Sequence, residues 1–147
     1  MSEEQAVLAA NAAFYAALAA GDYAAMDRLW ADAAPVACIH PGWPILVGRE
    51  AVMDSWRRIL ATPPGIACAD AACHAIPGPD PGTGTAYVTC MERIGPALLA
   101  ATNLFVREQG QWRIAHHQAG HVLETEAAPA PVPGSDPGMA PPHGRLH

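Results

Sequence analysis

Basic residues are scarce in this sequence. Its 147 residues include only 8 Lys and Arg against 14 Asp and Glu, which gives a formal net charge of −6 at pH 7. Proteins that bind nucleic acid neutralise its phosphates with a basic patch, and an anionic membrane surface attracts similar clusters. We therefore expect neither nucleic acid nor a membrane as a partner.

Long hydrophobic runs are also absent. No apolar stretch approaches the ~18 residues that a membrane-spanning helix needs. The first ten residues, MSEEQAVLAA, are acidic and lack the basic and apolar segments of a signal peptide. The four cysteines, Cys38, Cys68, Cys73 and Cys90, have neither C-x-x-C spacing nor the density of a disulfide scaffold. We expect free thiols in a cytoplasmic protein.

Motifs for nucleotide, covalent and metal chemistry are missing as well. The sequence has no Gly-rich phosphate loop, dinucleotide fingerprint or nucleophile elbow. Zinc ligands could in principle come from Cys38, His40, Glu92 and either His116 or His117. However, the sequence has neither an H-x-x-x-H helix nor paired cysteines to support such a site. The sequence therefore predicts neither a metal nor another cofactor.

The composition divides the chain into a folded domain and a tail. A length of 147 residues with 51% hydrophobic residues suits a single core. Residues 124–147 are rich in Pro, Ala and Gly and show no periodicity, which is typical of a flexible segment. We predict one domain over residues 1–123 and a flexible tail over residues 124–147.

Three helices and then a four-stranded meander are predicted within the domain. Ser2 and Gln5 form a capping-box pattern, and Gly21 is suited to end the first helix. A short second helix, one strand ending at His40, and a third helix over about 49–61 follow. Turn signals then separate four strands, over about 66–76, 84–95, 97–108 and 111–121. This order predicts an α+β fold in which a curved sheet wraps around helices.

The strand register brings polar residues onto one face of the predicted sheet. With two-residue turns, Asn103 lies opposite His116. Four hydrogen-bonding residues then share a face with apolar ones: Glu92, Asn103, His116 and Gln118. Buried polar groups need partners, so this face is typical of a binding cavity. A one-residue bulge would exchange the two faces and bring His117 inward in place of His116.

The stretch CIHPGWP, residues 38–44, places an ionisable ring where a strand ends. With an unperturbed pKa near 6.5, His40 is suited to be a general base. The alternative is a structural histidine that bonds a carbonyl at the strand end. Trp43 lies in the following loop and is a candidate rim of a pocket, whereas Trp30 and Trp56 lie on helix faces that favour packing.

Four segments carry a resemblance to a known family: FYAALAAGDYAAMDRLW, the strand ending in HPGW, GREAVMDSW and WRIAHHQAG. Together, over about residues 3–122, they resemble the nuclear transport factor 2-like (NTF2-like) superfamily, and most closely its SnoaL-like bacterial members. The resemblance implies a cone-shaped α+β barrel with three N-terminal helices packed on a curved, mainly antiparallel sheet. It also implies a pocket between helices and sheet, and a homodimer formed through the outer sheet face. Members include isomerases, cyclases, hydratases and domains that only bind, so the fold alone does not fix the function.

Ketosteroid isomerases within this superfamily offer the most informative comparison. The resemblance places His40, which precedes Pro41, at the position of their general base, and Asn103 at that of their hydrogen-bonding aspartate. Their oxyanion-hole tyrosine corresponds to Phe14, and we expect the neighbouring Tyr15 to point elsewhere. The resemblance therefore implies the pocket but not steroid-type chemistry, because one of two oxyanion donors is lost.

We predict a pocket for a small, largely apolar organic molecule. The predicted function is cofactor-free acid/base catalysis of an isomerisation, cyclisation or hydration, with His40 as base. Asn103 and His116 would stabilise an oxyanion or act as the acid. The predicted substrate-binding residues are Trp43, Trp56, Phe14, Glu92, Phe105, Gln118 and Trp30. The alternative is a non-catalytic ligand-binding or dimerisation module, in which the polar residues form only an internal network.

Overall fold

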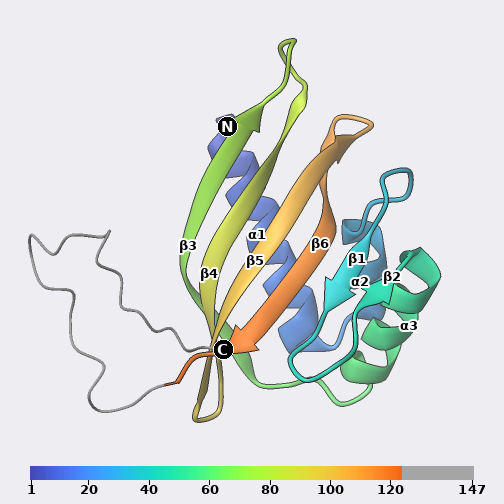
Figure 1. The fold of residues 1–147 in the computed structure, drawn as a ribbon, viewed down its shortest axis with the longest axis vertical. Coiled ribbons are helices and arrows are strands. Elements are labelled where there is room, and N and C mark those ends of the chain that lie inside the picture. Colours follow the sequence, from blue (N-terminus) through green and yellow to red (C-terminus); the bar gives the residue numbers. More distant parts are fainter. Residues whose placement is uncertain (124–147) are drawn as a thin grey trace, which may run out of the picture.

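Three helices and six strands make up the part of the chain that the computed structural model describes, residues 1–123 (Figure 1). In chain order they are α1 (Glu3–Ala20), α2 (Tyr23–Leu29), β1 (Ala37–Ile39), β2 (Leu46–Val47), α3 (Arg49–Leu60), β3 (Ile66–Pro77), β4 (Gly84–Ile94), β5 (Ala97–Glu108) and β6 (Gln111–His121). The predicted tail at 124–147 lies outside the described residues. Every helix in residues 1–123 is too short or too polar to cross a bilayer.

The six strands form one curved sheet in the order β2-β1-β6-β5-β4-β3. Neighbouring strands are antiparallel except β1 and β6, which run parallel. The sheet does not close, because β2 and β3 each have a neighbour on one side only. α1 lies across one face of the sheet, and α2 and α3 lie beside β1 and β2 (Figure 1). The predicted α+β architecture is confirmed, with β2 as an additional strand.

α1 begins and ends where the sequence predicts. The Ser2 hydroxyl accepts from the Gln5 backbone N–H, the Gln5 side chain accepts from the Ser2 N–H, and Gly21 ends the helix with φ of 68°. A left-handed φ favours glycine because it has no Cβ. One wide face of the helix is buried against the sheet: Val7, Asn11, Phe14, Tyr15 and Leu18. Two polar side chains of α1 are thereby turned toward the sheet.

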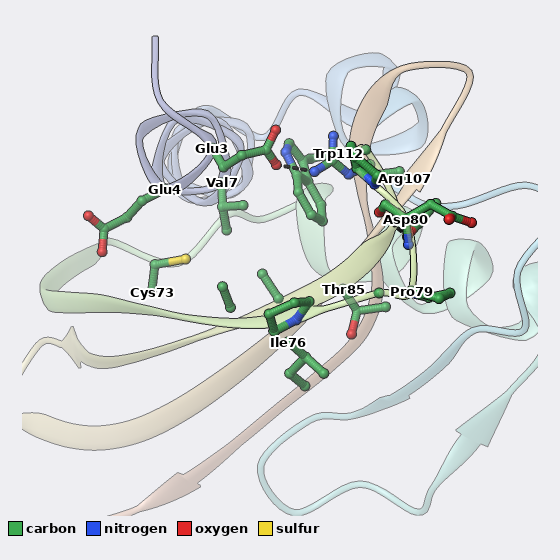
Figure 2. A pocket seen from close by; sticks show the side chains of 17 residues that line it. Glu3, Glu4, Val7, Cys73, Ile76, Pro79, Asp80, Thr85, Arg107 and Trp112 are labelled. Atoms are coloured by element: carbon green, nitrogen blue, oxygen red, sulfur yellow. Dashed lines mark hydrogen bonds and ion pairs between the residues drawn. The ribbon is translucent and has the colours of Figure 1, made fainter.

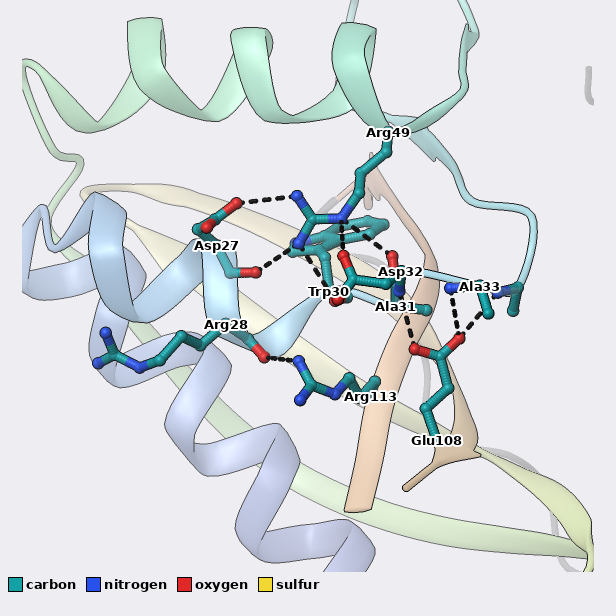
Figure 3. A network of polar contacts seen from close by, with 10 residues as sticks. Asp27, Arg28, Trp30, Ala31, Asp32, Ala33, Arg49, Glu108 and Arg113 are labelled. Carbon is teal, nitrogen blue, oxygen red and sulfur yellow. Dashed lines mark hydrogen bonds and ion pairs between the residues drawn. The ribbon is translucent and has the colours of Figure 1, made fainter. Parts of the chain in front are cut away.

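Arg49, the first residue of α3, connects that helix to the end of α2 (Figure 3). Its guanidinium group donates to the backbone carbonyls of Asp27, Trp30 and Ala31, and it also pairs with the carboxylates of Asp27 and Asp32. The last carbonyls of a helix have no partner within it. Arg49 therefore satisfies the end of α2 and fixes α3 beside it.

The hairpin of β5 and β6 begins in the predicted register and then departs from it. Near the turn, Phe105 lies opposite Ile114, as predicted. One step further, Leu104 lies opposite His116, so that Ala115 is the extra residue of a β-bulge. The remainder of β6 is displaced by one residue relative to the prediction.

The bulge exchanges the two faces of β6 beyond Ala115. His117, not His116, lies opposite Asn103 and is buried. The half-buried His116 donates from Nδ1 to the Ala37 carbonyl at 3.0 Å, and Gln118 is exposed. The predicted positions of His116 and Gln118 in the cavity are therefore wrong, and the alternative that allowed for a bulge is confirmed.

Candidate active site

A small cavity of about 140 Å³ lies between α1, α3 and the sheet. Three ionisable residues line it: His40, Glu92 and His117. Two tryptophans, Trp43 and Trp56, contribute aromatic surface. The rest of the wall is aliphatic: Leu18, Pro41, Ile59, Pro64, Ile66 and Ile94. We call this the histidine cavity.

His40 follows directly after β1, at the turn that ends the strand. Its imidazole is 4% exposed and lies between the rings of Trp43 and Trp56, with centroids 4.9 and 4.7 Å away. Nε2 lies 2.9 Å from Ser55 Oγ, and the Ser55 hydroxyl itself donates to the Val52 carbonyl at 2.6 Å. Since that hydroxyl proton is already engaged, Ser55 Oγ accepts from Nε2–H. The lone pair of His40 is then on Nδ1.

The His40 imidazole is neutral at pH 7. Burial lowers its pKa to about 4, and the positive charge of Arg58 acts in the same direction. Arg58 lies over the Trp43 ring, 5.0 Å from its centroid. Cys38 Sγ lies 3.8 Å from His40 Nδ1, so the thiol is the neighbour of that lone pair within the protein. A neutral imidazole can accept a proton or a hydrogen bond through such a lone pair.

His117 is held in one tautomer by Asn103. Its Nδ1 lies 2.6 Å from Asn103 Oδ1. The amide nitrogen of Asn103 donates to Asn11 Oδ1 at 2.9 Å and to the Tyr15 hydroxyl at 3.2 Å, so the amide oxygen is the acceptor. His117 therefore carries its proton on Nδ1 and its lone pair on Nε2.

The hydrogen bonds continue from Asn103 to a carboxyl group. Tyr15 donates its hydroxyl proton to Glu92 Oε2 at 2.5 Å and lies 3.3 Å from Cys90 Sγ. Burial raises the pKa of Glu92, and the bond from Tyr15 offsets part of that rise. Burial, followed by the charge of Glu92, also raises the pKa of Tyr15. We call His117, Asn103, Tyr15 and Glu92 the polar chain.

His117 is also neutral at pH 7. Burial lowers its pKa to about 3, and the positive charges that His40 and His116 can carry act in the same direction. The ring centroids of His117 and His40 are 6.2 Å apart. Two neutral imidazoles therefore line one aromatic cavity.

Several predicted site residues lie where a substrate would contact them. His40, Trp43, Trp56 and Glu92 line the histidine cavity. Asn103 lies behind His117 and is 0% exposed, so it reaches the cavity only through that imidazole.

Three predicted aromatic residues are part of the core instead. Phe14 packs against His117 and Trp56, with ring centroids 5.1 and 5.5 Å away. Trp30 and Phe105 are fully buried and lie outside the cavity wall. The Trp30 ring lies 6.3 Å from that of Trp56, so Phe14 and Trp30 pack against residues that line the cavity.

Three residues of the site were not predicted as such: Asn11, Tyr15 and Ser55. His117 was predicted only as the alternative to His116. Asn11 and Tyr15 lie one helical turn apart, which places both on the same side of α1. The spacing of these two residues in the sequence could have indicated that they share a face of α1. The expectation that Tyr15 points away is wrong, because its hydroxyl lies inside the polar chain. Ser55 is a small residue beside Trp56 on α3, and no feature of the neighbouring sequence indicated a role in the site.

Two further features bear on what the site can bind. Within residues 1–123, no three His, Cys, Asp or Glu side chains converge as metal ligands would. In the same part of the chain, the buried indole N–H of Trp56 has no hydrogen-bond acceptor. The indole N–H of Trp30 is unpaired in the same way, and both are exceptions because buried donors are nearly always paired.

A curved sheet folded around a long helix, with a small pocket at the end of β1, defines a class of α+β domains built around a ligand-sized cavity. The chain belongs to the SnoaL-like domain family of the NTF2-like superfamily, and residues 7–123 match that family. The superfamily predicted from the sequence is confirmed.

Two solved structures illustrate the similarity. A candidate dehydratase of the NTF2-like family from Streptomyces avermitilis is 36% identical, with a TM-score of 0.69, and the match covers 83% of this chain and 97% of that one. A candidate association domain of calcium/calmodulin-dependent protein kinase type II from Thiobacillus denitrificans is 32% identical. Its TM-score is 0.61, with 79% of this chain and 94% of that one covered.

A plant protein is similar over part of its length. F-box protein SKIP8 of Arabidopsis thaliana is 28% identical over 123 residues, which are 81% of this chain and 51% of that protein. This chain thus spans about half the length of that relative.

Proposed function

We propose that the histidine cavity binds a small carbonyl compound and catalyses proton transfer at the carbon next to the carbonyl group. The observation that supports this most directly is the fixed tautomer of His117. Its Nδ1–H is held by Asn103 Oδ1 at 2.6 Å, so the free lone pair is on Nε2 of a residue that lines the cavity. A general base needs this arrangement.

In this proposal Nε2 of His117 takes the proton from carbon. The Nδ1–H of the imidazolium ion that forms stays bonded to Asn103 Oδ1, and the hydrogen bonds continue through Tyr15 to Glu92. A partner that holds the second ring nitrogen also fixes the ring orientation. Asn103 and Tyr15 are therefore positioning residues, whereas His117 contacts the substrate.

The indole of Trp56 is the proposed donor to the substrate carbonyl. Its N–H is buried without an acceptor among residues 1–123, and negative charge develops on the carbonyl oxygen as the proton leaves. His40 keeps a proposed catalytic role as a second imidazole. Its Nδ1 lone pair accepts a hydrogen bond from a substrate hydroxyl and orients the molecule.

Two outcomes are open to the enolate that forms. The proton on His117 can return to a different carbon, which is an isomerisation. It can instead pass to a leaving hydroxyl group, which departs as water. The similarity to a candidate dehydratase at 36% identity favours the second outcome.

Deuterium exchange tests the proposal. The protein is incubated in D₂O with 3-hydroxycyclohexanone, and proton NMR follows both the exchange beside the carbonyl and the formation of cyclohexenone. His117→Gln should reduce the exchange rate by about 10²–10⁴-fold. His116→Gln is the matched control, because that neighbour lies on the outer face and should leave the rate unchanged.

The competing proposal is a non-catalytic binding module. It is favoured by the polar chain itself, whose hydrogen bonds are complete without a ligand. A protein that binds the ketone without accelerating exchange would support this module and exclude the proton-transfer proposal.

We also propose that two copies of the chain associate through the outer face of the sheet. A broad hollow of about 690 Å³ lies there over β4, β5 and β6. Small and apolar side chains in its wall, including Met91, Ala100 and Thr102, would let a second sheet approach closely.

A further inference from the structure

Two cavities beside α1 differ in the chemistry of their walls. One, of about 400 Å³, lies between the first turn of α1 and the β3–β4 hairpin (Figure 2). Its carboxylates belong to Glu3, Glu4 and Asp80, and no histidine of the described residues lies in its wall. The histidine cavity, by contrast, holds the carboxyl group of Glu92 together with two imidazoles. A carboxyl group that shares a site with a base is a candidate for the acid of the same reaction.

One oxygen of Glu92 is open to the histidine cavity. Glu92 lies on β4, lines this cavity and is 3% exposed. Tyr15 donates to Oε2 at 2.5 Å, whereas Oε1 has no hydrogen-bond partner among the described residues. The fully buried unpaired atoms of that part of the chain are Trp30 Nε1, Trp56 Nε1 and Arg107 Nε, and Oε1 is not one of them. Oε1 therefore faces the cavity that Glu92 lines.

The bond from Tyr15 decides which oxygen of a neutral Glu92 carries the proton. In a protonated carboxyl group, one oxygen donates and the other accepts. Since Oε2 already accepts from Tyr15, the proton is on Oε1. The acidic proton then faces the cavity rather than the protein interior. A general acid needs this orientation, because its proton must reach the substrate directly.

The protein reverses the usual order in which a glutamate and a histidine lose their protons. In water a glutamate ionises at lower pH than a histidinium ion, so a neutral imidazole and a protonated carboxyl group rarely coexist. Here burial lowers the pKa of His117 to about 3 and raises the pKa of Glu92. The imidazole is then free to accept a proton while the carboxyl group still holds one. Such opposite shifts distinguish the base of a site from its acid.

The other titratable groups that face Glu92 are uncharged at pH 7. Burial raises the pKa of the thiols of Cys68 on β3 and Cys90 on β4, and also that of Tyr15 on α1. The two imidazoles of the cavity are neutral as well. Among the described residues, the hydrogen bond from Tyr15 is the only contact that favours the ionised form of Glu92.

We propose that Glu92 is the general acid that protonates a hydroxyl group leaving the substrate, which makes the histidine cavity a site for dehydration of a 3-hydroxy carbonyl compound. This inference rests on the proposed proton-transfer function and refines its second outcome.

The reaction needs both groups. His117 Nε2 takes the proton from the carbon next to the carbonyl group, and an enolate forms. The electron pair of the enolate then makes the new C=C bond as the C–O bond breaks. The proton on Glu92 Oε1 passes to the departing oxygen, which leaves as water, so the hydroxyl group receives its proton from Glu92 and not directly from His117. The proton held by His117 returns through water to the Glu92 carboxylate, which restores both residues.

Two substrates separate the acid from the base. The wild type and Glu92→Gln, whose amide oxygen can still accept from Tyr15, are incubated in D₂O with 3-hydroxycyclohexanone or 3-fluorocyclohexanone and followed by proton NMR. With the hydroxy ketone, Glu92→Gln should slow cyclohexenone formation by about 10²-fold or more, and exchange beside the carbonyl by less than about tenfold. Fluoride leaves as a stable anion without a proton, so elimination from the fluoro ketone should stay within about tenfold of the wild-type rate. Glu50→Gln, in the first turn of α3, is the matched control and should change neither reaction.

The outcomes distinguish this inference from the proton-transfer function. An equal loss of elimination from both ketones in Glu92→Gln would overturn the role of Glu92 as the acid. A wild type that exchanges protons without eliminating water would also overturn it and leave the proton-transfer function intact, whereas a wild type that does neither would overturn both. Carboxyl-carbon NMR of the wild type needs no variant. Glu92 should lose its proton only well above the ordinary pKa of a glutamate, and an ordinary pKa would contradict the proposal.

Discussion

His116 and His117 are adjacent and chemically identical, yet the fold gives them different properties. His116 is half-buried and donates to a backbone carbonyl on the outer side of the sheet. His117 is 3% exposed, and a side-chain amide holds its proton. The tautomer and pKa of an imidazole depend on such partners rather than on residue type. This contrast makes the pair a natural internal control for experiments on the site.

Replacing Asn103 tests the polar chain as a structural unit. Asn103→Leu keeps a similar side-chain volume. It removes the hydrogen-bond partner of three buried groups: His117 Nδ1–H, Asn11 Oδ1 and the Tyr15 hydroxyl. Each unsatisfied buried group costs about 1–3 kcal/mol. We expect the free energy of unfolding, measured with urea, to fall by about 3 kcal/mol or more. Thr62→Val, at an exposed polar position, should change it by under about 0.5 kcal/mol.

The two buried histidines predict how stability depends on pH. Their pKa values are about 4 for His40 and about 3 for His117 in the folded protein, against an ordinary value near 6.5. Between these values the unfolded chain binds more protons, so the free energy of unfolding falls as the pH falls. Each histidine should remove about 2 kcal/mol between pH 7 and pH 5. The raised pKa of Glu92 opposes this, because the folded state then takes up a proton first.

Urea unfolding at pH 7 and pH 5 measures this effect. His117→Gln should lose less stability than the wild type over that interval, because it has one titrating group fewer. His116→Gln provides the comparison at the outer face. An identical pH dependence of the wild type and His117→Gln would show that His117 does not titrate as predicted.

At the scale of elements, the contact between α2 and α3 depends on Arg49 (Figure 3). A planar guanidinium group reaches several carbonyl oxygens at once, which the single ammonium group of lysine cannot do. Arg49→Lys should lower the free energy of unfolding by about 2 kcal/mol in urea titrations. Arg28→Lys is the control, since its side chain is exposed on α2. Equal stability of the two variants would contradict the role of Arg49.

Element boundaries were predictable because the signals that set them are local. The third helix was predicted over about 49–61 and spans Arg49–Leu60. The turns after Ile94 and Glu108 are also where the sequence places them. β2 was not predicted, because the two residues of Leu46–Val47 are too few to show an alternating pattern.

The candidate site was predictable only in part. It depends on the register between β5 and β6 and on how far the sheet curves around α1. The Ala115 side chain is small enough to lie on either face of β6. The alternation of apolar and polar residues along the strand therefore does not indicate the bulge. On α1, Phe14 and Tyr15 are 100° apart on the helix, and a curved sheet buries both. A flat sheet would leave the Tyr15 side chain exposed, which is the orientation predicted from the sequence.

At the scale of the whole molecule, association through the outer sheet face predicts a position at which a charged side chain would prevent dimerisation. Ala100 lies on β5 in the wall of that hollow. Ala100→Arg would introduce a charge where two sheets meet, so we expect monomers by native mass spectrometry where the wild type gives dimers. Ala24→Arg, at an exposed position on α2, should remain dimeric. A monomeric wild type would contradict the predicted association.

The β-bulge also affects how β6 tolerates sequence change. If a mutation moved the extra residue from Ala115 to a point beyond His117, the strand would slip by one residue and His116 would lie opposite Asn103. In most strands such a slip replaces an inward side chain with one of a different kind. Here it exchanges one imidazole for another, so a shift of the bulge would preserve the functional group while changing the residue that supplies it.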